Sequence, residues 1–296
     1  MIALMKRMWQ AVAKRCARAY LVGPELEDAL LACRWLSQQG FATTIGFWNA
    51  VGDAPPAVAR AYDEAADALS CEQLDCYLSI KAPAIGYCQE HVVNLVNRAQ
   101  AKGFRIHFDS LAPETADRAF SMIARALPLY PDLGCTLPSR WLRSPSDAAW
   151  AVDMGLNVRV VKGEWPDPTA PEIDARSNFL AVIDRLLGRA RHVAVATHDV
   201  TLAREAIRRL QAADTHCELE LLFGLPVRPA VRVARETGVP VRLYIPYGHA
   251  FLPYCLSQAR NNPRIFWWIM RDALLGHTLR MPRACRSGSV GSPERR

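Results

Sequence analysis

The hydrophobic positions of this chain form short apolar or β-branched runs that alternate with longer stretches of helical period. Eight of the short runs predict strands, at residues 41–46, 77–80, 104–108, 133–137, 157–161, 192–196, 217–222 and 241–245. The longer stretches predict amphipathic helices at residues 24–39, 57–70, 89–101, 113–126, 146–154, 173–189, 201–212 and 228–236. This alternation is typical of βα units around a parallel sheet.

Residues at the element boundaries support the same interpretation. Gly40, Gly103, Gly155 and Gly238 each follow a predicted helix, where a glycine commonly ends the last turn. Eight strands predict an α/β fold with a closed (β/α)8 TIM-type barrel in a single domain, because no strand is left over for an edge. An open doubly wound sheet is the alternative, although neither a GxGxxG nor a GxxxxGK[ST] motif follows a strand.

Composition and charge limit the possible domain organisations. With 296 residues, 51% of them hydrophobic, the chain can form one barrel. We predict a basic helix or extension at residues 1–20, the barrel at 21–276 and a disordered basic tail at 277–296. The net charge of +7 is concentrated at the two ends, since residues 25–275 alone carry −2. This distribution argues against nucleic acid as a partner.

Apolar runs and cysteines bear on the cellular location of the protein. No apolar run reaches the roughly 18 residues that span a bilayer. The nine cysteines show no CxxC pair and no zinc-type spacing, which favours reduced thiols and no metal site. We therefore expect a cytoplasmic protein, with basic ends that favour peripheral contact with an anionic surface such as the inner membrane.

Polar and charged side chains recur where the predicted strands end. They are Lys81, Asp109, Arg159, Lys162, Thr197, His198, Asp199, Glu218, Glu220 and Tyr244. Strand ends of a barrel meet at one mouth, so we expect these side chains to lie around a single site. Structural roles are the alternative: His198 bonded to a carbonyl in the core, or Lys81 and Asp109 as an ion pair at the rim.

Six segments, taken in order, resemble the proline dehydrogenase family, which includes the proline dehydrogenase domain of proline utilisation A. They are Ser79-Ile-Lys-Ala, Ile106-His-Phe-Asp, Val158-Arg-Val-Val-Lys-Gly, Ala196-Thr-His-Asp, Glu218-Leu-Glu-Leu-Leu-Phe-Gly and Arg242-Leu-Tyr-Ile-Pro-Tyr-Gly. The resemblance implies a distorted (β/α)8 barrel that binds FAD. It also implies oxidation of an amine C–N bond to an imine, with hydride transfer to flavin N5.

The resemblance also implies roles for particular residues. The implied cofactor contacts are Arg159, Val161, Lys162, Gly163, Glu164, Thr197, His198 and Glu220. The implied catalytic residues are Lys81, Asp109, Tyr244 and Tyr254. The implied substrate contacts are Lys81, Leu222, Tyr244, Ser257 and Gln258. Fixed cations beside the flavin would stabilise the negative charge of its reduced form.

The sequence departs from the family pattern at the substrate carboxylate. Ser257 and Gln258 stand where the family has two adjacent arginines, and Glu164 and Glu220 stand where it has uncharged residues. Charged hydrogen bonds contribute about 1.5–3 kcal/mol each, so losing two weakens carboxylate binding strongly. We therefore expect another amino acid or amine in preference to proline, with an extra cationic group or without a free carboxylate.

This interpretation names a small-molecule amine or amino acid as substrate and a quinone or dioxygen as electron acceptor. Two alternatives stay open. One is a Schiff-base lyase or aldolase on the same barrel, with Lys81 or Lys162 as the nucleophile. The other is a catalytically silent relative that has kept or lost the flavin.

Overall fold

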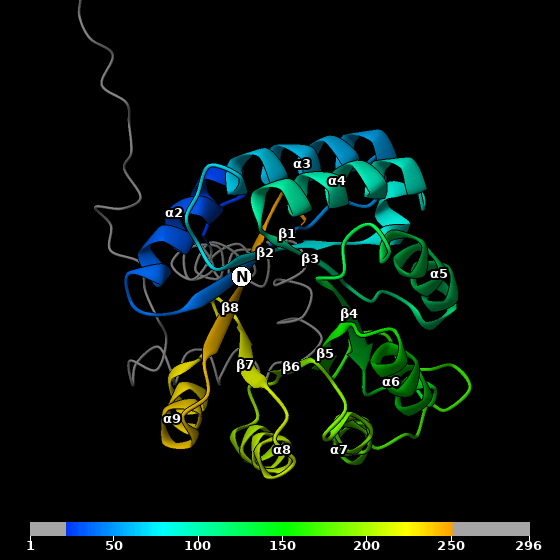
Figure 1. The fold of residues 1–296 in the computed structure, drawn as a ribbon, viewed down its shortest axis with the longest axis vertical. Coiled ribbons are helices and arrows are strands. Elements are labelled where there is room, and N and C mark those ends of the chain that lie inside the picture. The colour runs from blue at the N-terminus through cyan, green and yellow to red at the C-terminus, as the bar shows by residue number, and fades with distance from the viewer. Residues whose placement is uncertain (1–21, 251–296) are drawn as a thin grey trace, which may run out of the picture.

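The computed structural model describes residues 22–250, in which eight parallel strands close into a barrel surrounded by helices (Figure 1). The strands are β1 (Ala42–Phe47), β2 (Cys76–Ile80), β3 (Arg105–Phe108), β4 (Leu133–Pro138), β5 (Asn157–Val161), β6 (His192–Ala196), β7 (Cys217–Leu222) and β8 (Val241–Tyr247). Each strand pairs with the next, and β8 pairs with β1. The predicted single-domain (β/α)8 barrel is confirmed, and the open doubly wound sheet is wrong.

The helices follow the predicted ranges closely. They are α2 (Leu26–Ser37), α3 (Pro55–Leu69), α4 (Gln89–Lys102), α5 (Ala116–Ala126), α6 (Ser144–Asp153), α7 (Ala175–Leu186), α8 (Val200–Ala212) and α9 (Arg228–Thr237), with the 3-10 turns η1 (Ala82–Ile85) and η2 (Pro113–Thr115). The predicted helix at 173–189 is shorter because Asp174 caps it, accepting hydrogen bonds from the backbone N–H groups of Arg176 and Ser177. The predicted helix at 113–126 divides into η2 and α5.

The apolar core lies between the strands and the helices. Alternate residues of each strand face outward and are fully buried against the helices, among them Ile45, Leu78, Val160, Leu219 and Leu243. The residues between them face the barrel interior, and many are polar: Thr44, Ser79, His107, Thr136, Arg159, Glu218, Glu220 and Arg242 are all buried. This barrel therefore holds charge in its interior, where branched apolar side chains are usual.

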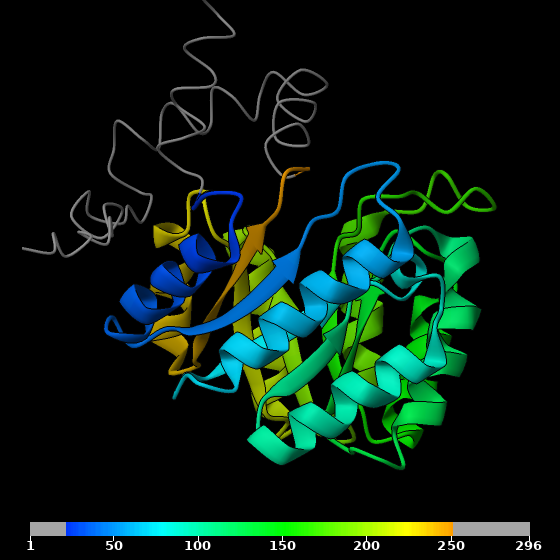
Figure 2. The same cartoon turned by 90° about the horizontal axis from the view of Figure 1, so that it is seen from above.

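Two buried ion pairs occupy that interior at different heights. Arg159 of β5 bonds to Glu220 near the carboxyl end of β7, across 2.6 Å. Arg242 of β8 bonds to Glu218 near the amino end of β7, across 2.7 Å. The two glutamates are two residues apart on one strand and so point to the same side of it. Figure 2 shows the strand arrowheads directed toward one end of the barrel, which we call the mouth.

Several other expectations concern the whole chain. No helix within residues 22–250 is long and apolar enough to cross a membrane. The six cysteines in this range are free thiols. The predicted extension at 1–20 and tail at 277–296, together with residues 251–276 of the predicted barrel, lie outside the described residues.

Candidate active site at the barrel mouth

Asp109 follows β3 and is the centre of a hydrogen-bonded cluster at the mouth. Its Oδ1 accepts hydrogen bonds from the Ser79 hydroxyl at 2.7 Å and from the Arg159 guanidinium at 2.8 Å. Its Oδ2 accepts a hydrogen bond from the Tyr244 hydroxyl at 2.8 Å, and the Nζ of Lys81 lies 3.8 Å away. Four side chains from three other strand ends therefore converge on one carboxylate, as barrel geometry predicts.

Lys81 lies directly after β2 with 11% of its side chain exposed. Its Nζ donates to the backbone carbonyl of Phe47 at 2.8 Å and lies 5.7 Å from the centre of the Trp48 ring. Burial lowers the pKa of Lys81, and the nearby Asp109 carboxylate opposes part of that shift. Lys81 thus forms the ion pair with Asp109 that was raised as its structural alternative, but this ammonium gives up its proton more easily than that of a surface lysine.

Tyr244 is held as a hydrogen-bond donor. Burial raises its pKa well above the usual value and the Asp109 carboxylate raises it further, so the phenol stays protonated. The Nε1 of Trp48 donates to the same phenolic oxygen at 3.4 Å. A Cβ atom at Gly46 would overlap the Tyr244 hydroxyl, so the tyrosine occupies space that a glycine on β1 leaves.

Arg159 and Glu220 form a bidentate pair beneath Asp109. The Nε and Nη2 of Arg159 donate to the two carboxylate oxygens of Glu220 at 2.6 and 2.8 Å. Burial lowers the pKa of Arg159, but the Glu220 and Asp109 carboxylates outweigh it, so the pKa is raised and the guanidinium stays charged. Glu220 therefore adds no net negative charge to the mouth, although the sequence suggested that it would.

The loop after β5 forms the rim of the mouth. Lys162 and Glu164 are exposed, whereas Val161 and Gly163 are half-buried. Gly163 has a φ of +88°, and a Cβ atom there would lie 2.6 Å from the side chain of Pro138. A glycine is therefore required where this loop crosses the end of β4.

His198 links the ends of β6 and β7. Its Nε2 accepts a hydrogen bond from the backbone N–H of Leu222 at 3.0 Å, so its Nδ1 carries the proton and donates to the Pro226 carbonyl at 3.1 Å. Burial lowers its pKa to about 4, which keeps the ring neutral. These contacts match the structural alternative raised for His198. The hydroxyl of neighbouring Thr197 accepts a hydrogen bond from the backbone of Asp199, which caps α8.

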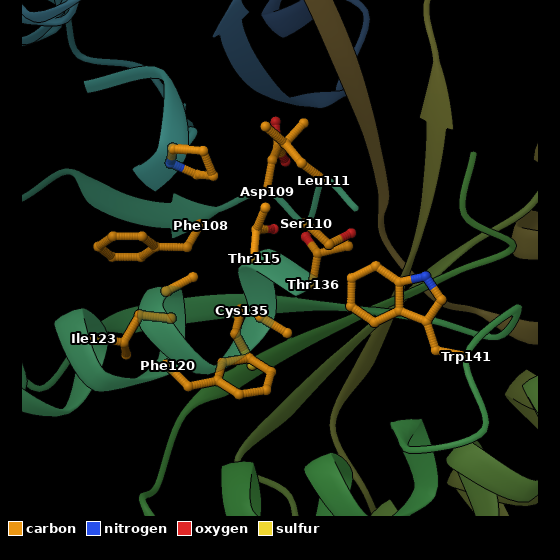
Figure 3. Close-up of a pocket in the computed structure, with 13 residues that line it drawn as sticks. Phe108, Asp109, Ser110, Leu111, Thr115, Phe120, Ile123, Cys135, Thr136 and Trp141 are labelled. Carbon is orange, nitrogen blue, oxygen red and sulfur yellow. The ribbon is translucent and has the colours of Figure 1, made fainter. Parts of the chain in front are cut away.

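A solvent-open hollow of about 330 Å³ lies beside Asp109, between the ends of β3 and β4 and helix α5. Figure 3 shows the ring of Phe120 across from Asp109, with Trp141 to one side. Because that volume includes open solvent, the recess itself encloses space for about one water molecule. The mouth therefore combines a closely packed charged floor with a small recess next to its central carboxylate.

Comparisons with known proteins agree with this geometry. No family model matches the chain. Proline dehydrogenase 1 of Bacillus subtilis is 23% identical over 274 residues, which cover 87% of this chain and 90% of that protein. The proline dehydrogenase of Deinococcus radiodurans is 22% identical over 292 residues, covering 92% of each. The chain is thus similar to proline dehydrogenases over most of its length.

Solved structures of two proline utilisation A proteins share the fold. Proline utilisation A of Corynebacterium freiburgense matches with a TM-score of 0.72 and 16% identity over 88% of this chain and 32% of that chain. Proline utilisation A of Bdellovibrio bacteriovorus, inactivated by N-propargylglycine, matches with a TM-score of 0.69 and 14% identity. The match covers 81% of this chain and 31% of that chain. This chain thus spans about a third of those proteins.

Of the site residues that the resemblance implies, five are in contact in the structure: Lys81, Asp109, Arg159, Glu220 and Tyr244. It places Val161, Lys162, Gly163, Glu164, Thr197, His198 and Leu222 around them at the ends of β5, β6 and β7. Tyr254, Ser257 and Gln258 lie outside the described residues. Sequence reasoning missed Trp48, although its position directly after β1 was a usable signal.

Proposed function

We propose that this chain is an FAD-dependent dehydrogenase that oxidises the C–N bond of proline, or of another small amine or amino acid, to an imine. The observation that carries the proposal is the buried cluster of Lys81, Asp109, Arg159 and Tyr244 at the mouth of the barrel. Similarity over most of the chain supports this type of oxidation, because the relatives are named as proline dehydrogenases.

The donor chemistry of the mouth fits FAD. Arg159 and Lys162 provide cations on and after β5, and Thr197 provides a hydroxyl after β6, the hydrogen-bonded neighbour of β5. Lys162 is exposed and has no ion-pair partner among residues 22–250, so it is available to a phosphate. Arg159 has five N–H donors, and its bonds to Glu220, Asp109 and Ser79 use four of them. These residues are the ones we propose to hold the cofactor.

When bound, FAD would accept the hydride from the carbon next to the amine nitrogen, and a quinone or dioxygen would finally take up the two electrons. The chain would desolvate and orient the amine. Tyr244 would wall the substrate with its ring. The ammonium of Lys81, held by the Phe47 carbonyl and the Asp109 carboxylate, would lie beside the substrate as a fixed cation.

We further propose a substrate other than proline, with an extra cationic group or without a free carboxylate. Support comes from the resemblance, which implies that Ser257 and Gln258 stand where proline dehydrogenases have two arginines for the substrate carboxylate. Glu220 does not add to this support, because Arg159 occupies both of its oxygens. A binding titration in which proline bound more tightly than every cationic amine would contradict this proposal.

Cofactor uptake is tested by incubating the purified protein with FAD, removing free FAD and recording the visible absorption. We expect a flavin spectrum, and about 10-fold weaker FAD binding in Lys162→Ala, since a charged hydrogen bond contributes about 1.5–3 kcal/mol. Lys102→Ala is the matched control, because Lys102 is an exposed lysine at the last turn of α4. A wild-type protein that stayed colourless would overturn the proposal.

A Schiff-base enzyme is the second candidate, because a buried lysine with a lowered pKa is a suitable nucleophile and Lys81 is one. Borohydride reduction in the presence of a carbonyl compound would leave Lys81 alkylated in that case. We expect no such adduct. A flavin that binds but is not reduced by any amine would instead identify a catalytically silent relative.

A further inference from the structure

We propose that Glu220 is a positioning residue that fixes Arg159 and cancels its charge next to the flavin, and that it thereby lowers the flavin midpoint potential. This inference rests on the proposed function. It assigns to Glu220 a role that acts through Arg159, because both carboxylate oxygens of Glu220 are bonded to that guanidinium.

The contacts of Glu220 fix the orientation of the guanidinium. Its two oxygens receive parallel hydrogen bonds from Arg159 at 2.6 and 2.8 Å, and Oε1 also accepts one from the Thr44 hydroxyl at 3.1 Å. The exposed fractions of the Arg159 and Glu220 side chains are 4% and 3%. Arg159, Glu220 and Thr44 lie on three different strands of the closed barrel. Their hydrogen bonds leave the guanidinium little freedom to reorient.

The charges of the cluster sum to zero. Arg159 and Lys81 are opposed by Asp109 and Glu220, and all four side chains are mostly buried. Electrostatic effects are strong where water is excluded, so the second carboxylate greatly reduces the positive field above Arg159. With an amide at position 220, the same group would carry one positive charge.

That difference bears on the reduced cofactor. Two-electron reduction leaves negative charge on the flavin, and a neighbouring cation stabilises that charge. Cancelling the cation therefore makes reduction less favourable. A tenfold change in the reduction equilibrium corresponds to about 30 mV for a two-electron couple. Glu220→Gln should raise the midpoint potential by at least that amount.

The matched control lies two residues away on the same strand. Glu218 is equally buried and bonds to its own arginine, Arg242, at 2.7 Å toward the opposite end of the barrel. Glu218→Gln makes the same chemical change and also weakens a buried pair. Loss of stability should therefore occur in both variants, whereas the shift in potential should occur only in Glu220→Gln.

The experiment measures the midpoint potential of the FAD-loaded wild type, Glu220→Gln and Glu218→Gln by anaerobic titration against a reference dye. We expect a tenfold or greater shift toward the reduced flavin in Glu220→Gln and no shift in Glu218→Gln. Equal shifts in both variants, or none in Glu220→Gln, would overturn the inference. Failure of the wild type to bind FAD would instead overturn the proposed function.

A measurement on the wild type covers the case in which Glu220→Gln does not fold. The pH dependence of the midpoint potential changes slope where the N1 proton of the reduced flavin titrates. A mouth without net charge should leave that pH close to its value in free FAD. A slope change displaced downward by one pH unit or more would show a net cation beside the ring and would contradict the inference.

Discussion

The hydroxyl of Tyr244 on β8 donates to the Oδ2 of Asp109 after β3 across 2.8 Å. These two strands are not neighbours in the barrel, so the bond spans its interior. The same carboxylate receives Arg159 from β5 through Oδ1. The Asp109 side chain thus connects three separate parts of the barrel wall, and we expect the stability of the mouth to depend on it.

Tyr244→Phe keeps the aromatic ring and removes the hydroxyl that Asp109 accepts. A hydrogen bond to a charged group contributes about 1.5–3 kcal/mol, so we expect a loss of that size in the free energy of unfolding in urea. Tyr130→Phe is the matched control, because its hydroxyl donates to the neutral carbonyl of Phe104 at 2.9 Å. That control should lose about 0.5–1.5 kcal/mol. A loss in Tyr244→Phe no larger than in the control would contradict this account of Asp109.

Gly46→Ala should displace Tyr244, because the added methyl group would overlap the phenolic oxygen. We expect overpacking to destabilise the protein by about 1–3 kcal/mol and to weaken substrate binding. In a Tyr244→Ala background the methyl group has room, so the same change should have a much smaller effect. Urea unfolding of the two single variants and the double variant measures this coupling. Additive effects would show that the two residues do not contact each other.

Acid should destabilise the protein between pH 6.5 and about 4 in part through His198. Its pKa falls from 6.5 to about 4 on burial, so the unfolded chain binds more protons than the folded protein in this window. The contribution of His198 to stability is therefore fully present above pH 6.5 and is lost as the pH falls toward 4. Protonation of Nε2 would also remove the acceptor for the Leu222 N–H.

His198→Gln should flatten this pH dependence without abolishing it. His192, whose pKa also falls to about 4 through burial, contributes a decrease of the same sign and is untouched by the substitution. Unfolding free energies measured in urea at pH 7 and pH 5 for both proteins check the prediction. An identical decrease in the variant and the wild type would mean that His198 does not titrate as described.

The sequence pattern was sufficient for the eight strands and for the residues at their ends, since periodicity and strand ends are local features. The pairing of those residues was only partly predictable. Lys81 was expected beside Asp109 and lies 3.8 Å away, but Arg159 is the closer partner at 2.8 Å. Contacts across a barrel depend on strand tilt and stagger, which a linear pattern does not contain.

The same limitation explains what the sequence alone misassigned or missed. Glu220 suggested extra negative charge at the mouth, yet Arg159 neutralises it from the other side of the barrel interior. Thr44 gave no sign of its bond to Glu220, because 176 residues separate the two in the chain. Trp48 follows a strand, as the charged candidates do, and a search confined to titratable residues passes over it.

The most direct test of the proposed function is the anaerobic addition of candidate substrates to the FAD-loaded protein while the visible flavin absorption is recorded. The panel includes proline, proline esters and amides, and diamines. We predict that at least one amine bleaches the flavin band, with a carboxylate-free or cationic compound acting at lower concentration than proline. A flavin that no amine in the panel bleaches would contradict the assignment of this barrel mouth as an amine-oxidising site.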